Sequence, residues 1–223
     1  MRYLAPILIG FLGAAVLFGL GVWQLQRLDE KLAILAEIEA RIAADPVPLP
    51  AEPNQQADRF LPVTAEGQFG EEELDVLTSQ PPEGAGYRVI APFETGDGRR
   101  ILVDRGFIAE EDKGAARPGG ETVSLTGNLH WPDETDGFTP EPDEGRGIWF
   151  ARDVAAMAAE LGTEETFMVL RDPAGSGAPR PIPVGVEGIP NNHLGYAIQW
   201  FGLGIVWLGM TALWLWRIRR RTD

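Results

Sequence analysis

The sequence predicts an α+β fold in which two transmembrane helices flank an exported antiparallel β-sheet or small barrel domain with one or two helices. Two uncharged apolar segments, residues 4–23 and 194–216, predict the transmembrane helices. Between them, short strand-like segments separated by glycine and proline predict the sheet. With 223 residues, the chain has room for one such domain and not for a large multidomain enzyme.

The first apolar segment, LAPILIGFLGAAVLFGLGVW, is long enough to cross a bilayer as a helix. At a rise of about 1.5 Å per residue it measures about 30 Å, the thickness of the hydrocarbon core. A cleaved signal peptide is the alternative, and it fits less well. The apolar run is long, lacks a small-x-small cleavage site at its end and continues into WQLQRLDEK.

An amphipathic helix is predicted to continue this span, because leucine and isoleucine recur at spacings of three and four between residues 28 and 42. The prolines of residues 46–53 end it, since proline lacks the amide donor. The predicted divisions are residues 1–25 for the first transmembrane helix, 26–45 for its extension, 46–193 for the extracytoplasmic, mainly antiparallel β domain, 194–216 for the second transmembrane helix and 217–223 for a basic cytoplasmic tail.

Within the central domain, six segments have the composition of strands. They are residues 60–69, 72–80, 87–95, 99–108, 121–131 and 165–172. Gly96-Asp97-Gly98 predicts a hairpin-like turn between the third and fourth, because glycine reaches positive φ without steric cost. A short helix is predicted at residues 153–162, where it ends on a glycine. Asp104 and Arg105 could form a buried ion pair, but a solvated strand end is the favoured interpretation.

The distribution of charge predicts the membrane orientation. The tail RIRRRTD is strongly basic, and arginine and lysine near a span stay in the cytoplasm, so both termini are expected inside. Residues 24–193 then lie outside; they hold 14 Lys and Arg against 32 Asp and Glu, a net charge of −18. A domain with this net charge repels nucleic acid and anionic lipid, and the lipid bilayer is expected to surround the two spans.

The absence of cysteine excludes disulfides and metal binding through thiolates. No Arg-rich, Ser-rich transit peptide precedes the first span, so we expect a bacterial inner membrane with the central domain in the periplasm.

Histidine supplies most haem and metal ligation, and the chain has only His130 and His193. His130 is interpreted as a surface or strand-end residue. His193 directly precedes the second span, where small and aromatic residues follow it along one helix face. The face consists of His193, Ala197, Trp200, Gly204 and Trp207. It offers a slot for a planar ligand, topped by an imidazole that could bind iron. The alternative is that Tyr196 and Trp200 form an interfacial aromatic belt and His193 hydrogen-bonds a loop.

On the first helix, Trp23 and Arg27 share a face at the same membrane boundary. Arg27 could neutralise the carboxylates of a cofactor, or it anchors the helix end and pairs with Glu30. Deeper in the membrane, two small-xxx-small pairs, Gly10 with Ala14 and Ala15 with Gly19, are suited to packing against the second span.

Three blocks of sequence, taken in order, resemble the Surfeit-locus family of cytochrome c oxidase assembly factors. They are GVWQLQRLDEK at residues 21–31, GYRVIAPFETGDGRRILVDRGFI at residues 86–108 and NNHLGYAIQWFGL at residues 191–203. The acidic loop of residues 132–147 matches nothing in the family's pattern. In this order, with the two flanking spans and this chain length, the blocks are specific for the family, and the expected member is bacterial.

The resemblance implies a non-enzymatic protein needed for maturation of oxidase subunit I, with bacterial members that bind haem a and hand it on. The family's C-terminal histidine corresponds to His193, and its Trp-Gln-x-x-Arg block to Trp23, Gln24 and Arg27. The predicted cofactor site is therefore His193, Arg27, Trp23, Trp200 and Tyr196, with His193 as the ligand of the haem iron. Oxidase subunit I and haem a synthase are the expected partners.

The main alternative is a membrane scaffold that stabilises an oxidase assembly intermediate and binds no cofactor. A copper donor is disfavoured, because copper(I) carriers use Cys and Met ligands and this chain has no Cys and no Met cluster. A haem-modifying enzyme would need several intramembrane histidines, which the sequence lacks.

The orientation can be tested with a reporter that is active only in the periplasm. Fused after Asp223, it should be inactive, because the basic tail keeps the C-terminus in the cytoplasm. The same reporter inserted in the acidic loop of residues 132–147 should be active. The opposite pattern would show that the orientation is inverted.

Overall fold

The computed structural model describes residues 3–115, 117, 120–143, 145–175 and 178–220. The chain divides into two units, each described by itself below. One unit, Met1–Glu37 with Val186–Asp223, contains most of the two long helices, and the other, Ile38–Gly185, contains a β-barrel. The predicted fold class, two apolar helices flanking a β domain with a helix, is confirmed.

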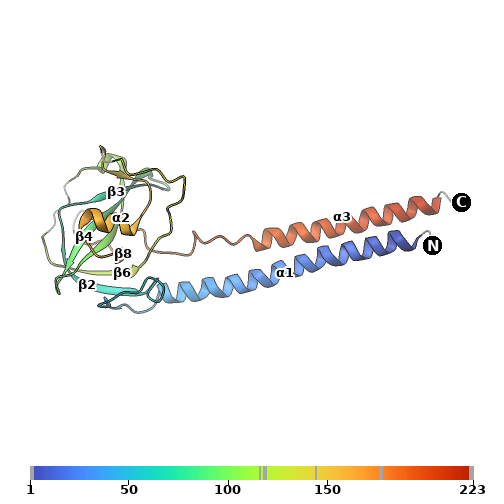
Figure 1. Ribbon diagram of the computed structural model, residues 1–223, viewed down its shortest axis with the longest axis horizontal. Coiled ribbons are helices and arrows are strands. Elements are labelled where there is room, and N and C mark those ends of the chain that lie inside the picture. Colours follow the sequence, from blue (N-terminus) through green and yellow to red (C-terminus); the bar gives the residue numbers. More distant parts are fainter. Residues whose placement is uncertain (1–2, 116, 118–119, 144, 176–177, 221–223) are drawn as a thin grey trace. The chain divides into compact units, whose positions relative to one another are not determined.

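The two long helices are α1, Leu4–Ile42, and α3, His193–Arg220. They lie side by side and run antiparallel, so that the N-terminus of α1 and the C-terminus of α3 share one end of the pair (Figure 1). Both are long and apolar enough to cross a membrane. α1 continues without a break from the apolar segment through the amphipathic one.

The sheet has eight strands, in the spatial order β1-β2-β6-β8-β5-β4-β3-β7. Their bounds are β1 Val47–Pro48, β2 Pro62–Phe69, β3 Leu74–Gln80, β4 Gly84–Thr95, β5 Arg100–Ala109, β6 Val123–Leu129, β7 Ile148–Trp149 and β8 Phe167–Leu170. An additional pairing of β2 with β4 closes β2, β6, β8, β5 and β4 into a barrel, one of the two arrangements that the sequence predicted. A single turn of 3₁₀-helix, η1 at Glu110–Asp112, follows β5. The two-residue strands β1 and β7 are too short for the sequence pattern to indicate.

The expectation of an antiparallel sheet needs one correction inside the barrel. β5 and β8 pair in parallel, whereas the other four pairings of the ring are antiparallel. Strand directions can alternate around a closed ring only if the number of strands is even. With five strands, one neighbouring pair must run the same way. The long connection between β5 and β8, which includes helix α2 at Val154–Leu161, provides the crossover that a parallel pair requires.

The barrel core is formed by apolar side chains that are almost completely buried. The largest include Phe93, Phe167, Ile90, Leu102 and Met157. Met157 belongs to α2, whose apolar face packs into the same core. The α2 helix begins at the cap residue Asp153, which accepts a hydrogen bond from the amide of Ala156 at 3.0 Å, and it ends at Gly162 with φ +61°.

The predicted turn between β4 and β5 is also confirmed. The amide of Gly98, at φ +84°, donates to the carbonyl of Thr95 at 2.8 Å, and the amide of Thr95 donates to the carbonyl of Arg99 at the same distance. Glycine adopts this positive φ without a Cβ clash.

Asp104 and Arg105 are both buried, so the favoured interpretation of a solvated strand end is wrong. The Asp104 side chain is inaccessible; it lies 2.7 Å from the guanidinium of Arg88 and 3.4 Å from that of Arg152. Arg105 instead pairs with Glu73 at 2.6 Å. The two neighbours do not pair with each other, because successive side chains of a strand point to opposite faces.

The end of α1 is held by polar side chains of the barrel. The carbonyl of Ile42, in the last turn, accepts hydrogen bonds from Arg171 and, at 3.1 Å, from the Asn128 amide. Arg171 also donates to the side-chain oxygen of Asn128 at 2.8 Å. A helix ends with unsatisfied carbonyls and a partial negative charge, and an arginine there satisfies both.

His130 follows β6 directly, which agrees with its interpretation as a strand-end residue. Its ring stacks on Phe60 at a centroid distance of 5.5 Å, and its Nδ1 is buried without a hydrogen-bond partner among the described residues. Burial, together with the charges of Arg152 and Arg59, lowers the pKa of His130 to about 4. The imidazole is therefore neutral in the folded protein near neutral pH.

Replacing the buried carboxylate should destabilise the barrel far more than replacing an exposed one. Asp104→Asn leaves Arg88 and Arg152 without their shared anion, which costs roughly 3 kcal/mol or more of unfolding free energy. Glu72→Gln is the matched control, because its pair with Arg100 is 3.5 Å long and exposed, worth less than about 1 kcal/mol. Guanidinium unfolding of the full chain in detergent measures both. Equal midpoints for the two variants would contradict the assignment.

The neutral state of His130 makes stability depend on pH. Its folded pKa of about 4 lies below the value of about 6.5 in an unfolded chain, so the unfolded state binds more protons between these values. Stability contributed by His130 is complete above about pH 6.5 and is lost as the pH falls toward 4. In His130→Phe, which keeps the stacking on Phe60, unfolding free energy should fall less over this range. If the unfolding free energies of the natural protein and of His130→Phe changed equally with pH, the prediction would be refuted.

Candidate functional site

The helix pair packs through small residues, which let the two backbones approach closely. The residues that α1 buries are Pro6, Gly10, Ala14, Gly21 and Gln24, and those of α3 are Ala197 and Gly204. All but one of these are apolar. Gln24 is the exception. It lies three residues after Gly21 and extends the buried face of α1 toward the end of the pair where α3 begins.

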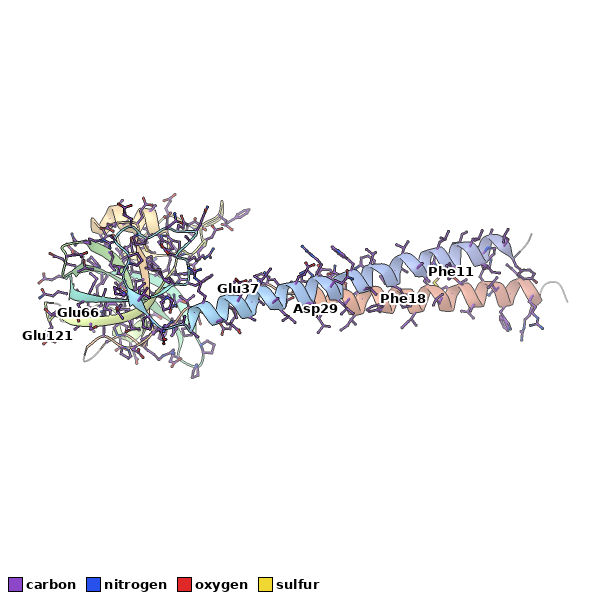
Figure 2. All side chains as sticks on the ribbon, turned by 90° about the horizontal axis from the view of Figure 1, so that it is seen from below. Phe11, Phe18, Asp29, Glu37, Glu66 and Glu121 are labelled. Carbon is purple, nitrogen blue, oxygen red and sulfur yellow. The ribbon has the colours of Figure 1, made fainter. Side chains whose placement is uncertain are left out.

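Large side chains of each helix cover the small residues of the other. Phe201 lies over Gly21, where an added Cβ would come within 2.7 Å of its ring. Phe18, labelled in Figure 2, lies over Gly204 in the same way, and the rings of Phe18 and Phe201 are 5.9 Å apart. These contacts fix which faces of α1 and α3 meet.

Only one of the two predicted small-xxx-small pairs lies in this interface. Gly10 and Ala14 are buried against α3, and Thr211 covers Gly10. Ala15 and Gly19 are exposed, and the space beside Gly19 is open, so their predicted role in packing is wrong. The two pairs lie on different faces of α1, and an apolar sequence does not show which face meets the partner helix.

His193 and Gln24 meet where α3 begins. Nδ1 of His193 lies 2.8 Å from Oε1 of Gln24, and Gln24 is only 9% exposed. Since an amide oxygen only accepts, Nδ1 carries the hydrogen in this pair. Nε2 then keeps its lone pair, and the described part of the chain offers it no hydrogen bond. The result is a partly buried imidazole with a fixed tautomer and one basic nitrogen.

The aromatic residues of the predicted site lie within about two helical turns of this contact along α1 and α3. Trp200 is partly buried, one turn beyond the buried Ala197, and Tyr196 is 51% exposed. Trp23 is 49% exposed, although it neighbours Gln24. Their rings are therefore accessible from the surroundings of the helices.

Arg27 is exposed and pairs with Glu30 at 2.6 Å, three residues further along α1. This is the alternative arrangement that the sequence analysis considered. Arg27 lies three residues after Gln24 on α1, which is about one helical turn.

Sequence reasoning matched Gln24 to the family's Trp-Gln-x-x-Arg block but did not include it among the residues of the cofactor site. A signal was available, because Gln24 is a polar residue at a spacing of three from Gly21, in register with Gly10 and Ala14. Polar side chains at such positions in membrane helices hydrogen-bond across the interface. Elsewhere in the described residues, no group of three or more His, Asp or Glu side chains is arranged to hold a metal ion.

Comparison with known proteins adds an independent line of evidence. The sequence pattern of the SURF1 family matches residues 11–205. Surfeit locus protein 1 of Rattus norvegicus is 32% identical over 214 residues, which cover 85% of this chain and 69% of that protein. The same protein of Homo sapiens is 33% identical over 83% of this chain and 69% of its own length. A SURF1-like protein of Monosiga brevicollis is 32% identical over 84% of this chain and 79% of its own length.

The family match covers all three blocks that carried the resemblance, including the two that meet at His193 and Gln24. Both the family match and the identity to the relatives extend over most of the chain. The chain therefore belongs to the SURF1 family, a family of cytochrome oxidase assembly factors.

Proposed function

We propose that this protein carries haem a at the outer face of a bacterial inner membrane and delivers it to oxidase subunit I. The observation that carries the proposal is the contact between His193 and Gln24, which leaves one basic nitrogen on a fixed imidazole. The protein acts as a chaperone rather than an enzyme. Haem a is its cargo, and a haem a synthase is the expected donor.

The geometry of His193 suits an iron ligand. Histidines that bind metals usually donate their second ring N–H to a fixed acceptor, which sets the tautomer and orients the ring. Gln24 has this relation to His193. Because Gln24 is buried in a helix contact, its amide has little freedom to turn away. The unbonded Nε2 is the nitrogen that would meet the iron.

The aromatic residues support the binding of a large planar group. Tyr196 and Trp200 lie three and seven residues after His193, on the same side of α3. In a membrane, the exposed ring of Tyr196 and the partly exposed ring of Trp200 can contact the faces of a porphyrin or the lipid around it. Trp23, beside Gln24, adds a further apolar ring on α1.

Arg27 is suited to the propionates of haem, although it now pairs with Glu30. Both side chains of that pair are more than half exposed, and an exposed ion pair is worth less than about 1 kcal/mol. Exchanging the Glu30 carboxylate for a propionate therefore costs little. Guanidinium groups bind carboxylates in a bidentate manner, which favours the exchange.

A binding series on purified protein tests the proposal. Full-length protein co-expressed with a haem a synthase should show a Soret absorption band. His193→Ala should abolish the band, because the iron loses its ligand. Gln24→Leu should weaken binding by about 10- to 100-fold, since the ring is no longer oriented. Arg27→Ala should weaken binding by about fivefold at most, because its charge is exposed.

His130→Phe is the matched control, because it removes the other histidine and should retain the band. Full haem content in His193→Ala would refute the ligand assignment. The natural protein could instead carry no haem while deletion of its gene still lowers the oxidase content of the cells. That result would support the alternative function, a membrane scaffold that binds no cofactor.

A further inference from the structure

A groove of about 370 Å³ opens on the helix pair near the end where α1 begins and α3 finishes. Ile9 contributes one side, and α3 supplies the rest, chiefly Trp207, Leu213, Trp214 and Arg217. This is the end opposite to His193. The groove is apolar along most of its length, with a guanidinium at one end.

Trp207 lines the groove at the end farther from Arg217, and contacts with α1 hold its ring in place. The indole of Trp207 lies over Gly13, and its Nε1–H donates to the carbonyl of Gly10 at 3.1 Å. The hydroxyl of Thr211, also in the lining, donates to the backbone carbonyl of Trp207 at 2.8 Å. The polar atoms of these two side chains are thus bonded within the helix pair, and the groove presents apolar surface.

The length of the groove matches one leaflet of a bilayer. Trp207 and Arg217 are ten residues apart, which is about 15 Å along a helix. The hydrocarbon core of a bilayer is about 30 Å thick, so half of it is about 15 Å. With α3 in a membrane, Arg217 lies at the level of the headgroups while Trp207 is near the middle.

We propose that this groove binds one acyl chain of an anionic phospholipid, whose phosphate pairs with Arg217. Guanidinium groups are well suited to phosphate, and basic residues at the membrane surface attract anionic lipids. Arg219 and Arg220 add positive charge at the same end. A transmembrane helix of another protein fits the groove less well. Membrane helices pack against small residues, whereas large side chains, two of them indoles, line this groove.

Quenching of tryptophan fluorescence by lipids with brominated acyl chains tests the proposal, and it requires no haem. The full chain is reconstituted in phosphatidylcholine vesicles that contain a minor fraction of brominated phosphatidylglycerol, or the same fraction of brominated phosphatidylcholine. Quenching should be greater with the anionic lipid, because it occupies the groove beside Trp207 and Trp214. The excess should fall in Trp214→Phe, which removes one of the two tryptophans that line the groove.

Two arginine variants distinguish binding of the anionic lipid in the groove from its non-specific electrostatic attraction to the basic end of α3. Arg217→Gln should reduce the preference for the anionic lipid by about fivefold, whereas Arg219→Gln, outside the groove, should retain most of it. Equal loss in both variants, or equal quenching by the two brominated lipids, would overturn the proposal. An excess that disappears as the protein-to-lipid ratio rises would overturn it too, and would assign the groove to a second copy of the chain.

Discussion

The close approach of α1 and α3 is the constraint on which the candidate site depends. In lipid there is little hydrophobic force between two apolar helices, so their association relies on packing and on hydrogen bonds between them. Glycine and alanine on both helices allow this approach, and phenylalanine rings fill the spaces they leave. The same alignment that seats Phe201 on Gly21 brings Gln24 opposite His193.

The buried face of the helix pair changes in chemistry from one end to the other. At the α1 start, Trp207 donates to a backbone carbonyl and closes an apolar groove. In the middle, glycines and aromatic rings interlock. At the His193 end, the contact becomes a hydrogen bond between an amide and an imidazole. One antiparallel packing thus supports two candidate sites of opposite character, an apolar one for a lipid chain and a polar one for a metal ligand.

In the barrel, by contrast, oppositely charged side chains are buried together. Asp104 is shared by Arg88 and Arg152, and Arg88 also donates to the carbonyl of Ile182, which ties the segment after β8 to the barrel. The last turn of α1 is capped by Asn128 and Arg171. Such bonds are directional, so they fix where segments enter and leave the barrel, whereas apolar burial alone is non-directional.

The sequence by itself determined the two long apolar helices, most of the strands, the turn at Gly98 and the position of His193 at the start of α3, because hydropathy, periodicity and glycine placement are local signals. Only the tertiary structure decided that Gln24 is the partner of His193, that Gly10 and Ala14 rather than Ala15 and Gly19 face α3, and that Asp104 is buried between arginines. Each of these depends on which surfaces of two distant segments meet. A helix that is apolar all round does not reveal its contact face, and a charged residue on a strand does not reveal which charges the other strands bring to it.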